Sequence, residues 1–233
     1  MTTPSKTWIA GLPKDRLIAE FSVWSADLVR LADDLARIDP YVDILHIDVA
    51  DGHFAPAMLF FPDLVAGVRK VSSRPIHVHL MVADSILLSQ IEQFADAGSD
   101  LISLHVENES VAAEALDLLD RRGVAAGMVL KVDTPVERVE RYVSRLSFVT
   151  LLGTAIGVKG QGLDAKAGAR LQQAKQIIAD WGAAHRIVLA ADGGIREHTV
   201  PLLHQSGAET VVLGSLVFDA PSLDERMAWL RAL

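Results

Sequence analysis

Apolar and polar residues follow one another in blocks that suit strands and helices in turn. Eight short, almost continuous apolar runs lie at 17–24, 42–48, 76–81, 101–106, 125–131, 146–152, 186–191 and 209–213. Such runs are typical of parallel strands that are buried on both faces. Between them, apolar positions recur at helical spacing over 62–71, 84–97, 110–122, 135–143, 165–181 and 197–205.

Helix-start signals mark the first and the last expected helix. Ser25-Ala26-Asp27 precedes apolar residues at helical spacing from Leu28 to Leu35, which predicts a helix capped by this tripeptide. A terminal helix is predicted to begin at about Pro221, because proline suits a first helical position.

The number and order of these segments predict the fold class. Eight strand–helix units follow one another without a Pro/Ser-rich linker, which favours a closed α/β (β/α)8 TIM barrel. We expect a single barrel domain over 16–233, preceded by an N-terminal arm over 1–15. The alternative is a doubly wound open sheet. It would need a Gly-rich fingerprint after the first strand, and Ser22-Val23-Trp24-Ser25 is not one.

Composition narrows the function classes. Half of the 233 residues are hydrophobic and the net charge is −8, which argues against nucleic-acid binding and a polybasic membrane contact. An anionic substrate stays possible, because backbone amides can bind phosphate. The absence of Cys excludes disulfides and thiolate metal ligands. No apolar run suits a membrane span or a signal peptide, so we expect a cytoplasmic enzyme.

Polar side chains stand at the ends of several apolar runs, where a core would not require them. His46 and Asp48 end the second run and share one face of a strand, since residues two apart point the same way. His79, His105 and Asp192 fall at or near the ends of three other runs. Active sites of such barrels lie at the carboxyl ends of the strands, so we expect these side chains to converge.

Six motifs at these strand ends resemble one known family. They are Ser22-Val23-Trp24-Ser25-Ala26-Asp27, His46-Ile47-Asp48-Val49-Ala50-Asp51-Gly52-His53-Phe54, His77-Val78-His79-Leu80-Met81-Val82, Leu104-His105-Val106-Glu107, Ala191-Asp192-Gly193-Gly194 and Leu213-Gly214-Ser215-Leu216-Val217-Phe218. In this order they are similar to the ribulose-phosphate 3-epimerases and their pentulose- and hexulose-phosphate relatives. The resemblance runs from about Ser22 to Phe218.

The resemblance implies a metal-dependent isomerase of carbohydrate metabolism, in the pentose phosphate area. It makes His46, Asp48, His79 and Asp192 the ligands of one divalent cation, which is Zn, Fe, Mn or Co. The reaction inverts carbon 3 of a phosphorylated ketose, such as ribulose 5-phosphate or xylulose 5-phosphate, through an enediolate. Asp48 and Asp192 are then the acid and base, one for each face. The family also implies a homo-oligomer, either a dimer or a hexamer.

Further residues are assigned to the substrate by the same resemblance. Those expected to contact the sugar or its phosphate are Ser22, His79, Gly157, Gly160, Gly193, Gly194, Gly214 and Ser215. His77 stands where the family commonly has Asp, and we interpret it as a core residue or one that orients His79. His105 is either part of the pocket wall or a hydrogen-bonded barrel histidine.

The chain departs from the family around the expected pocket. After the sixth run the family usually has Asn-Pro-Gly-Phe-Gly-Gly-Gln, whereas this chain has Ala155-Ile156-Gly157-Val158-Lys159-Gly160-Gln161. A mobile lid is still expected there, and Lys159 either meets an anionic part of the substrate or is a solvated loop residue. Ala50 and Leu152 replace common methionines, Ala57 replaces Asn, and Trp24 is bulkier than usual. These changes leave the identity of the sugar open.

Two competing functions remain. The orotidine-phosphate decarboxylase group typically has an Asp-x-Lys-x-x-Asp run, and Asp48-Val49-Ala50-Asp51 lacks the lysine. A non-catalytic sugar-phosphate binder would not need the acid–base pair Asp48 and Asp192. Exchange of the carbon-3 proton with solvent deuterium separates this binder from an epimerase.

Overall fold

Parallel strands form a closed barrel at the centre of the molecule. The computed structural model describes residues 6–182 and 186–233, so residues 1–5 of the expected arm lie outside it. In the described chain the barrel strands are β1 (Ile18–Ser22), β2 (Ile44–Asp51), β4 (Ile76–Met81), β5 (Leu101–His105), β6 (Ala125–Leu130), β7 (Phe148–Leu152), β8 (Val188–Asp192) and β9 (Thr210–Leu213). Parallel pairing of β1 with both β9 and β2 closes the ring. The expected (β/α)8 barrel is therefore confirmed.

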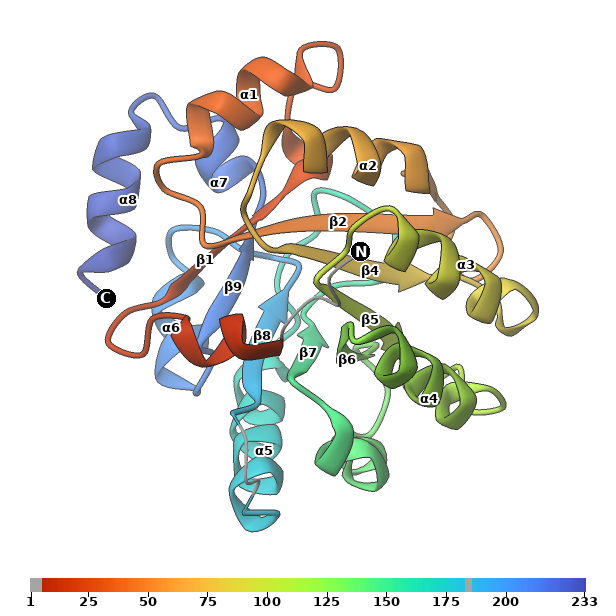
Figure 1. Ribbon diagram of the computed structural model, residues 1–233. Helices are drawn as coiled ribbons and strands as arrows, with labels where there is room; N and C mark the ends of the chain where they lie inside the picture. Colours follow the sequence, from red (N-terminus) through yellow and green to blue (C-terminus); the bar gives the residue numbers. More distant parts are fainter. Residues whose placement is uncertain (1–5, 183–185) are drawn as a thin grey trace.

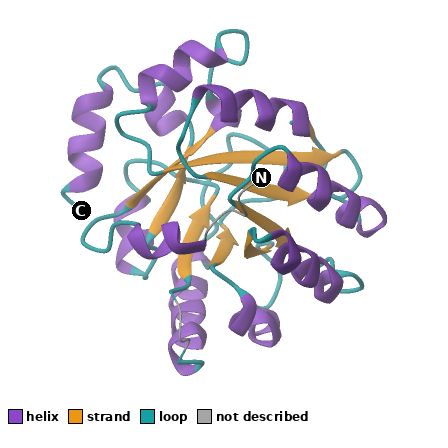
Figure 2. Ribbon diagram, viewed as in Figure 1, coloured by secondary structure: helices purple, strands orange, loops and turns teal. Residues whose placement is uncertain are grey.

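Helices surround the barrel and cover its outer face (Figures 1 and 2). They are α1 (Leu31–Ile38), α2 (Pro62–Val71), α3 (Asp84–Asp96), α4 (Ala112–Arg122), α5 (Ala167–Asp180), α6 (Val200–Gln205), α7 (Ser215–Phe218) and α8 (Leu223–Arg231). Each longer helix buries one apolar stripe. In α3 the stripe is Leu87, Ile91 and Phe94, all fully buried, whose spacing of four and three residues keeps them on one face.

The predicted starts of the first and last helices are wrong. The carboxylate of Asp27 accepts a hydrogen bond from the Val29 amide and so caps a local turn, and α1 begins only at Leu31. Leu28, expected on the apolar stripe, is 51% exposed. At the other end, α8 begins at Leu223, because the Ser222 hydroxyl oxygen accepts from the Glu225 amide.

The segment predicted as a helix over 135–143 is a 3-10 helix, η3 (Val136–Arg145). Val136, Val139 and Tyr142 are buried and lie three residues apart, which matches three residues per turn. A short strand that was not expected, β3 (Met58–Leu59), pairs antiparallel with the end of β2. It lengthens the wall of the barrel at the carboxyl end.

The interior of the barrel changes from apolar to polar along the strands. Near their starts the interior is filled by Ile18, Ile44, Leu101, Ala125, Phe148 and Val188, and Ile9 and Leu12 of the arm pack against this cluster. Two residues farther along β1 and β2 stand Glu20 and His46, both fully buried. Barrel interiors are usually filled by branched apolar side chains, so this polar layer needs an explanation.

No helix in the described ranges is both long enough and apolar enough to span a membrane.

Candidate active site

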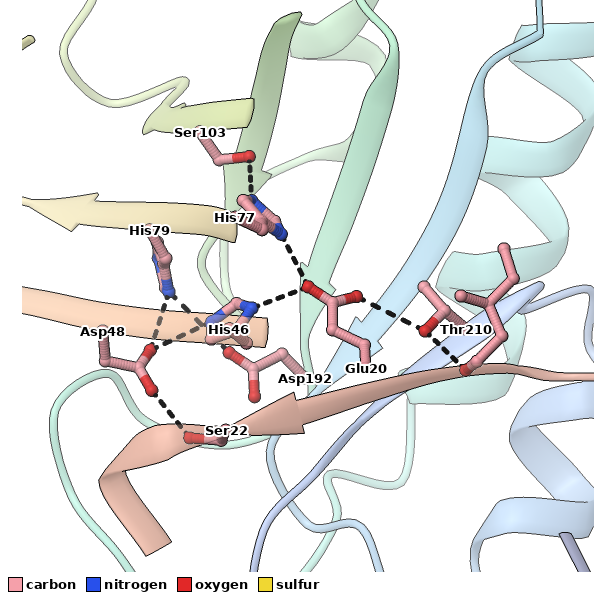
Figure 3. A network of polar contacts seen from close by, with 10 residues as sticks. Glu20, Ser22, His46, Asp48, His77, His79, Ser103, Asp192 and Thr210 are labelled. Carbon is pink, nitrogen blue, oxygen red and sulfur yellow. Dashed lines mark hydrogen bonds and ion pairs between the residues drawn. The ribbon is translucent and has the colours of Figure 1, made fainter. Parts of the chain in front are cut away.

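Four predicted residues meet at the carboxyl end of the barrel (Figure 3). His46 and Asp48 come from β2, His79 from β4 and Asp192 from β8, and one ligand atom of each lies within 4.8 Å of the others. The pairing register sets Asp48 beside His79. Asp48 Oδ1 lies 3.2 Å from His46 Nε2 and 3.2 Å from His79 Nδ1, and His79 Nδ1 lies 3.8 Å from Asp192 Oδ2.

The orientation of His46 is fixed by a buried carboxylate behind it. Glu20 Oε1 lies 2.8 Å from His46 Nδ1, and neither side chain is exposed. Although burial alone would raise it, contacts with His77 and His46 hold the pKa of Glu20 far below its usual range. An ionised carboxylate only accepts hydrogen bonds, so His46 donates from Nδ1. Nε2 is therefore the His46 nitrogen that faces Asp48.

His79 is held by a chain of two further residues. His79 Nε2 lies 2.9 Å from His105 Nε2, and His105 Nδ1 lies 3.1 Å from Glu107 Oε2. The pKa of Glu107 is about 2, because hydrogen bonds from His105 and Thr134 outweigh the raising effect of burial. His105 thus donates to Glu107, and burial lowers the pKa of His105 to about 4, which keeps its ring neutral. His79 donates from Nε2 to His105, so Nδ1 is the His79 nitrogen that faces Asp48.

These tautomers make the site one that attracts a cation. Two imidazole nitrogens and two carboxylates face a common point, and each imidazole offers a lone pair there when that nitrogen carries no proton. With no cation bound, burial lowers the pKa of His46 but Asp48 and Glu20 raise it well above the usual value, so Nε2 then carries a proton that it donates to Asp48. A bound cation would take the place of this proton. Ligand atoms around a tetrahedral cation with bonds of about 2.0 Å lie about 3.3 Å apart. The two separations of 3.2 Å fit that spacing.

The two carboxylates of the site differ in their affinity for a proton. Burial raises the pKa of Asp48, but the neighbouring His46 and His79 outweigh it and hold the value far below the usual range. Burial and then the charge of Asp48 raise the pKa of Asp192 to about 6. At neutral pH the site therefore combines one firmly ionised carboxylate with one that gains and loses a proton easily.

A cavity of about 400 Å³ opens directly above these residues. All the residues predicted for the substrate line it: Ser22, His79, Gly157, Gly160, Gly193, Gly194, Gly214 and Ser215. Asp48 and Asp192 line it too, whereas His46 is fully buried and lies behind Asp48. Ser22 donates a hydrogen bond of 3.0 Å to Asp48 Oδ2. This serine is one of the residues expected to contact the substrate, and it also holds the Asp48 carboxylate in place.

Glycines at the β8 and β9 ends leave bare backbone at one side of the cavity. Gly194 has a φ of +70°, and a Cβ there would lie 2.8 Å from the Leu163 Cα. At Gly214 a Cβ would lie 2.7 Å from the Ser25 hydroxyl oxygen. Close packing therefore requires glycine at both positions, and it leaves amide groups unshielded by side chains on the cavity wall.

The segment after β7 crosses the mouth of the cavity. At one end Gly157 packs so closely that a Cβ there would lie 3.1 Å from the Ala55 Cβ. At the other, Lys159 Nζ donates a hydrogen bond of 2.7 Å to the Trp24 carbonyl oxygen and lies 4.6 Å from the centre of its ring. Lys159 and Trp24 both line the cavity. Because Lys159 is also exposed to solvent, both interpretations of this residue stay predictions.

For two neighbouring histidines the structure decides between the alternatives that the sequence left open. His77 is a buried core residue, whose Nδ1 lies 2.6 Å from Glu20 Oε1 and whose Nε2 lies 2.6 Å from Ser103 Oγ. His105 is fully buried and hydrogen-bonded, so it is not part of the cavity wall. The residue that sequence reasoning missed is Glu20. Its signal was a charged residue within the apolar strand Ile18–Ser22.

Comparison with known proteins identifies the family to which this chain belongs. Residues 18–218 match the profile described as the ribulose-phosphate 3 epimerase family. The ribulose-phosphate 3-epimerase of Bacillus subtilis (strain 168) is 33% identical over 198 residues, which are 84% of this chain and 90% of that protein. Ribulose-phosphate 3-epimerase 1 of Cupriavidus necator is 33% identical over 209 residues, 87% of this chain and 85% of that protein.

Solved structures share the fold at lower identity. A 3-hexulose-6-phosphate synthase has a TM-score of 0.64 at 18% identity, and the match covers 93% of this chain and 96% of that one. The orotidine 5'-phosphate decarboxylase from Pyrococcus horikoshii OT3 has a TM-score of 0.65 at 11% identity, with 92% and 97% covered. These likenesses show the barrel alone. Because the profile spans every barrel strand and the curated relatives cover most of the chain, this protein is an isomerase that belongs to the ribulose-phosphate 3-epimerase family.

Proposed function

We propose that this protein inverts carbon 3 of a phosphorylated ketose, such as ribulose 5-phosphate or xylulose 5-phosphate, in a metal-dependent reaction. The observation that carries the proposal is the pair Asp48 and Asp192. Both carboxylates line one cavity, and they come from strands β2 and β8, which β1 and β9 separate. Their surroundings lower the pKa of Asp48 and raise that of Asp192. Family membership supports the reaction class.

The chemistry needs a base on one face of the sugar and an acid on the other. A proton leaves carbon 3, next to the ketone, and another returns from the opposite face. The ionised Asp48 is suited to accept a proton, and Asp192, with a pKa of about 6, is suited to hold one and give it up. In the reverse direction the two residues exchange roles. The Ser22 hydroxyl keeps Asp48 in place through its hydrogen bond.

The ligands of the proposed divalent cation are His46, Asp48, His79 and Asp192. When bound, the cation supplies positive charge that stabilises the negative enediolate. A set of two imidazoles and two carboxylates suits Zn, Fe, Mn or Co equally well. His46 and His79 contribute the lone pairs that Glu20 and His105 direct toward the ion.

The phosphate of the substrate is placed at the glycine side of the cavity. Gly193, Gly194 and Gly214 expose backbone there, and Ser215 adds a hydroxyl group. Lys159 and Arg196 line the same cavity and bring positive charge to an otherwise acidic protein. A phosphorylated ketose therefore fits with its phosphate at this side and its carbon 3 above the carboxylates.

Proton exchange at carbon 3 tests the proposal directly. Zinc-loaded protein is incubated in deuterium oxide with a panel of ketose phosphates, and the position of the label is measured by NMR. We expect deuterium at carbon 3 of at least one pentulose phosphate, together with the inverted product. If no member of the panel exchanges its carbon-3 proton, the protein is a sugar-phosphate binder and the proposed epimerase is wrong.

A further inference from the structure

A charged residue in the middle of the barrel has no part in the reaction described above. Glu20 belongs to β1, none of its side chain is exposed, and it lies behind the metal ligands rather than among them (Figure 3). Burying a carboxylate is costly unless several hydrogen bonds compensate it. The hydrogen-bond partners of Glu20 therefore indicate its role in the barrel.

Glu20 binds two histidines through one oxygen. Its Oε1 lies 2.8 Å from His46 Nδ1 and 2.6 Å from His77 Nδ1, and its Oε2 accepts a hydrogen bond of 3.3 Å from the Thr210 hydroxyl. On the far side, His77 Nε2 lies 2.6 Å from Ser103 Oγ. These contacts link five strands of the barrel, β9, β1, β2, β4 and β5, into one hydrogen-bonded layer.

The same three residues, Glu20, His46 and His77, form a second group whose ligand atoms lie close enough to hold a metal ion. Their separations argue for hydrogen bonds instead. Both nitrogens lie within 2.8 Å of one oxygen, which is a charge-assisted hydrogen-bond length. Ligands of a tetrahedral ion would lie about 3.3 Å apart. The layer is therefore a support for the site above it.

We propose that Glu20 is a positioning residue, which holds the His46 ring so that Nε2 faces the cation. This inference rests on the proposed metal site. A carboxylate on the far nitrogen of a metal-binding histidine fixes its tautomer and strengthens its nitrogen as a ligand. The Nδ1–H group of His46 is thus hydrogen-bonded to the negatively charged Glu20. The Nε2–H group of His79 is instead hydrogen-bonded to the neutral ring of His105.

Zinc affinity of the variant Glu20→Gln tests the proposal, with Ser103→Ala as the matched control. Glutamine keeps the size of the side chain but removes its charge, whereas Ser103→Ala opens the far end of the layer and leaves the bond to His46 intact. Binding is measured by competition with a chromophoric chelator, without substrate. We expect one zinc per chain in every form and an affinity about 10- to 100-fold lower in Glu20→Gln. In Ser103→Ala we expect an affinity within about threefold of wild type, because the charge on His46 remains.

Three results would overturn the proposal. They are an unchanged affinity in Glu20→Gln, an equal loss in Ser103→Ala, and two zinc ions per wild-type chain, which would make Glu20 a metal ligand. A measurement on the unaltered protein covers the case in which Glu20→Gln does not fold. In zinc-loaded protein labelled with 15N-histidine, His46 must carry its proton on Nδ1, and a proton on Nε2 would contradict the proposal. Neither measurement involves turnover, so each stands apart from the carbon-3 exchange test.

Discussion

His46 and His79 present different nitrogens to the same point, and each is held by a different kind of partner. His46 offers Nε2 because Glu20 occupies Nδ1, whereas His79 offers Nδ1 because His105 occupies Nε2. His46 is two residues from Asp48 along β2 and His79 lies directly beside it on β4, and the two rings turn different nitrogens toward Asp48. The surrounding hydrogen bonds therefore determine the ligand atoms, not the histidines alone.

Replacing either carboxylate by its amide tests the acid–base pair at the residue scale. In Asp48→Asn and in Asp192→Asn we expect turnover to fall by about 100- to 10,000-fold, because a general acid or base is lost on one face. Both amides keep the shape of the site, so circular dichroism and gel filtration should match wild type. Asp219→Asn, at the rim of the same cavity, is the control and should retain turnover. Near-normal turnover in either site variant would exclude the two-carboxylate mechanism.

The buried histidines His77 and His105 make stability depend on pH. Burial lowers the pKa of each to about 4, against about 6.5 for a free histidine. Between these values the unfolded chain binds more protons than the folded one, so stability is full above about pH 6.5 and declines as pH falls toward 4. The decline is at most on the order of 3 kcal/mol for each histidine.

Thermal unfolding of chelator-treated protein between pH 7.5 and 4.5 measures this effect. His105→Gln, whose side chain does not titrate, should show a flatter dependence of Tm on pH over the same range. An equally steep slope in that variant would show that His105 does not contribute.

Which of these residues the sequence could reveal depends on where they stand in their strands. His46, Asp48, His79 and Asp192 stand at or near the ends of the predicted apolar runs, although β2 and β4 continue beyond them in the structure, and a period of two puts them on the inner face. Glu20 also faces inward, but it lies in mid-strand. Its role depends on two histidines that are distant in sequence, and strand stagger decides which inner residues share a layer. Periodicity within one strand carries no such information.

At the scale of elements, local hydrogen bonds and helix type explain why some helix predictions are wrong. The apolar spacing near Leu28 suggested a helix, yet the Asp27 side chain satisfies the Val29 amide and ends the turn there. In η3 a spacing of three buries Val136, Val139 and Tyr142, and a short helical pattern does not separate a 3-10 helix from an α-helix. Where the stripe is long, as in α3, the predicted bounds agree within one residue.

Lys159 gives the segment after β7 a testable function. Its ammonium group donates one hydrogen bond to the Trp24 carbonyl, and two further N–H groups are available to a phosphate in the cavity. In Lys159→Met we expect the KM for the ketose phosphate to rise about tenfold, since a charge-assisted contact is lost. The kcat should stay within about threefold, because Asp48 and Asp192 are untouched.

Lys70→Met is the matched control for this experiment, because Lys70 lies on α2 away from the cavity. Its kinetics should match wild type. If Lys159→Met also leaves the KM unchanged, Lys159 is a solvated loop residue after all.

At the scale of the whole molecule, barrel closure is what turns separate strand ends into a site. Asp48 and Asp192 are 144 positions apart in sequence, and the ring β8–β9–β1–β2 brings them to one cavity. The count of strand–helix units predicted this closure without any knowledge of register. The expected dimer or hexamer has no such signature in a single chain, and it stays a prediction that sedimentation equilibrium would measure.

Removal of the proposed metal should affect the whole molecule, because its four proposed ligands come from three strands. A cation that binds only the folded chain stabilises it by about 2.7 kcal/mol when its free concentration is 100 times its Kd. For a chain of 233 residues this corresponds to roughly 5–10 °C in Tm. Chelation should therefore lower Tm by about that amount and abolish carbon-3 exchange, and added zinc should restore both.

The dependence on concentration separates this effect from general stabilisation by salt. Above the Kd, Tm should rise steadily with the logarithm of free zinc in wild type, and the same concentrations of magnesium should have little effect, since imidazole ligands disfavour that ion. The His46→Gln variant loses one ligand and should show a weaker rise. A protein that contains no metal by elemental analysis yet still catalyses carbon-3 exchange would show that the two carboxylates work without a cation.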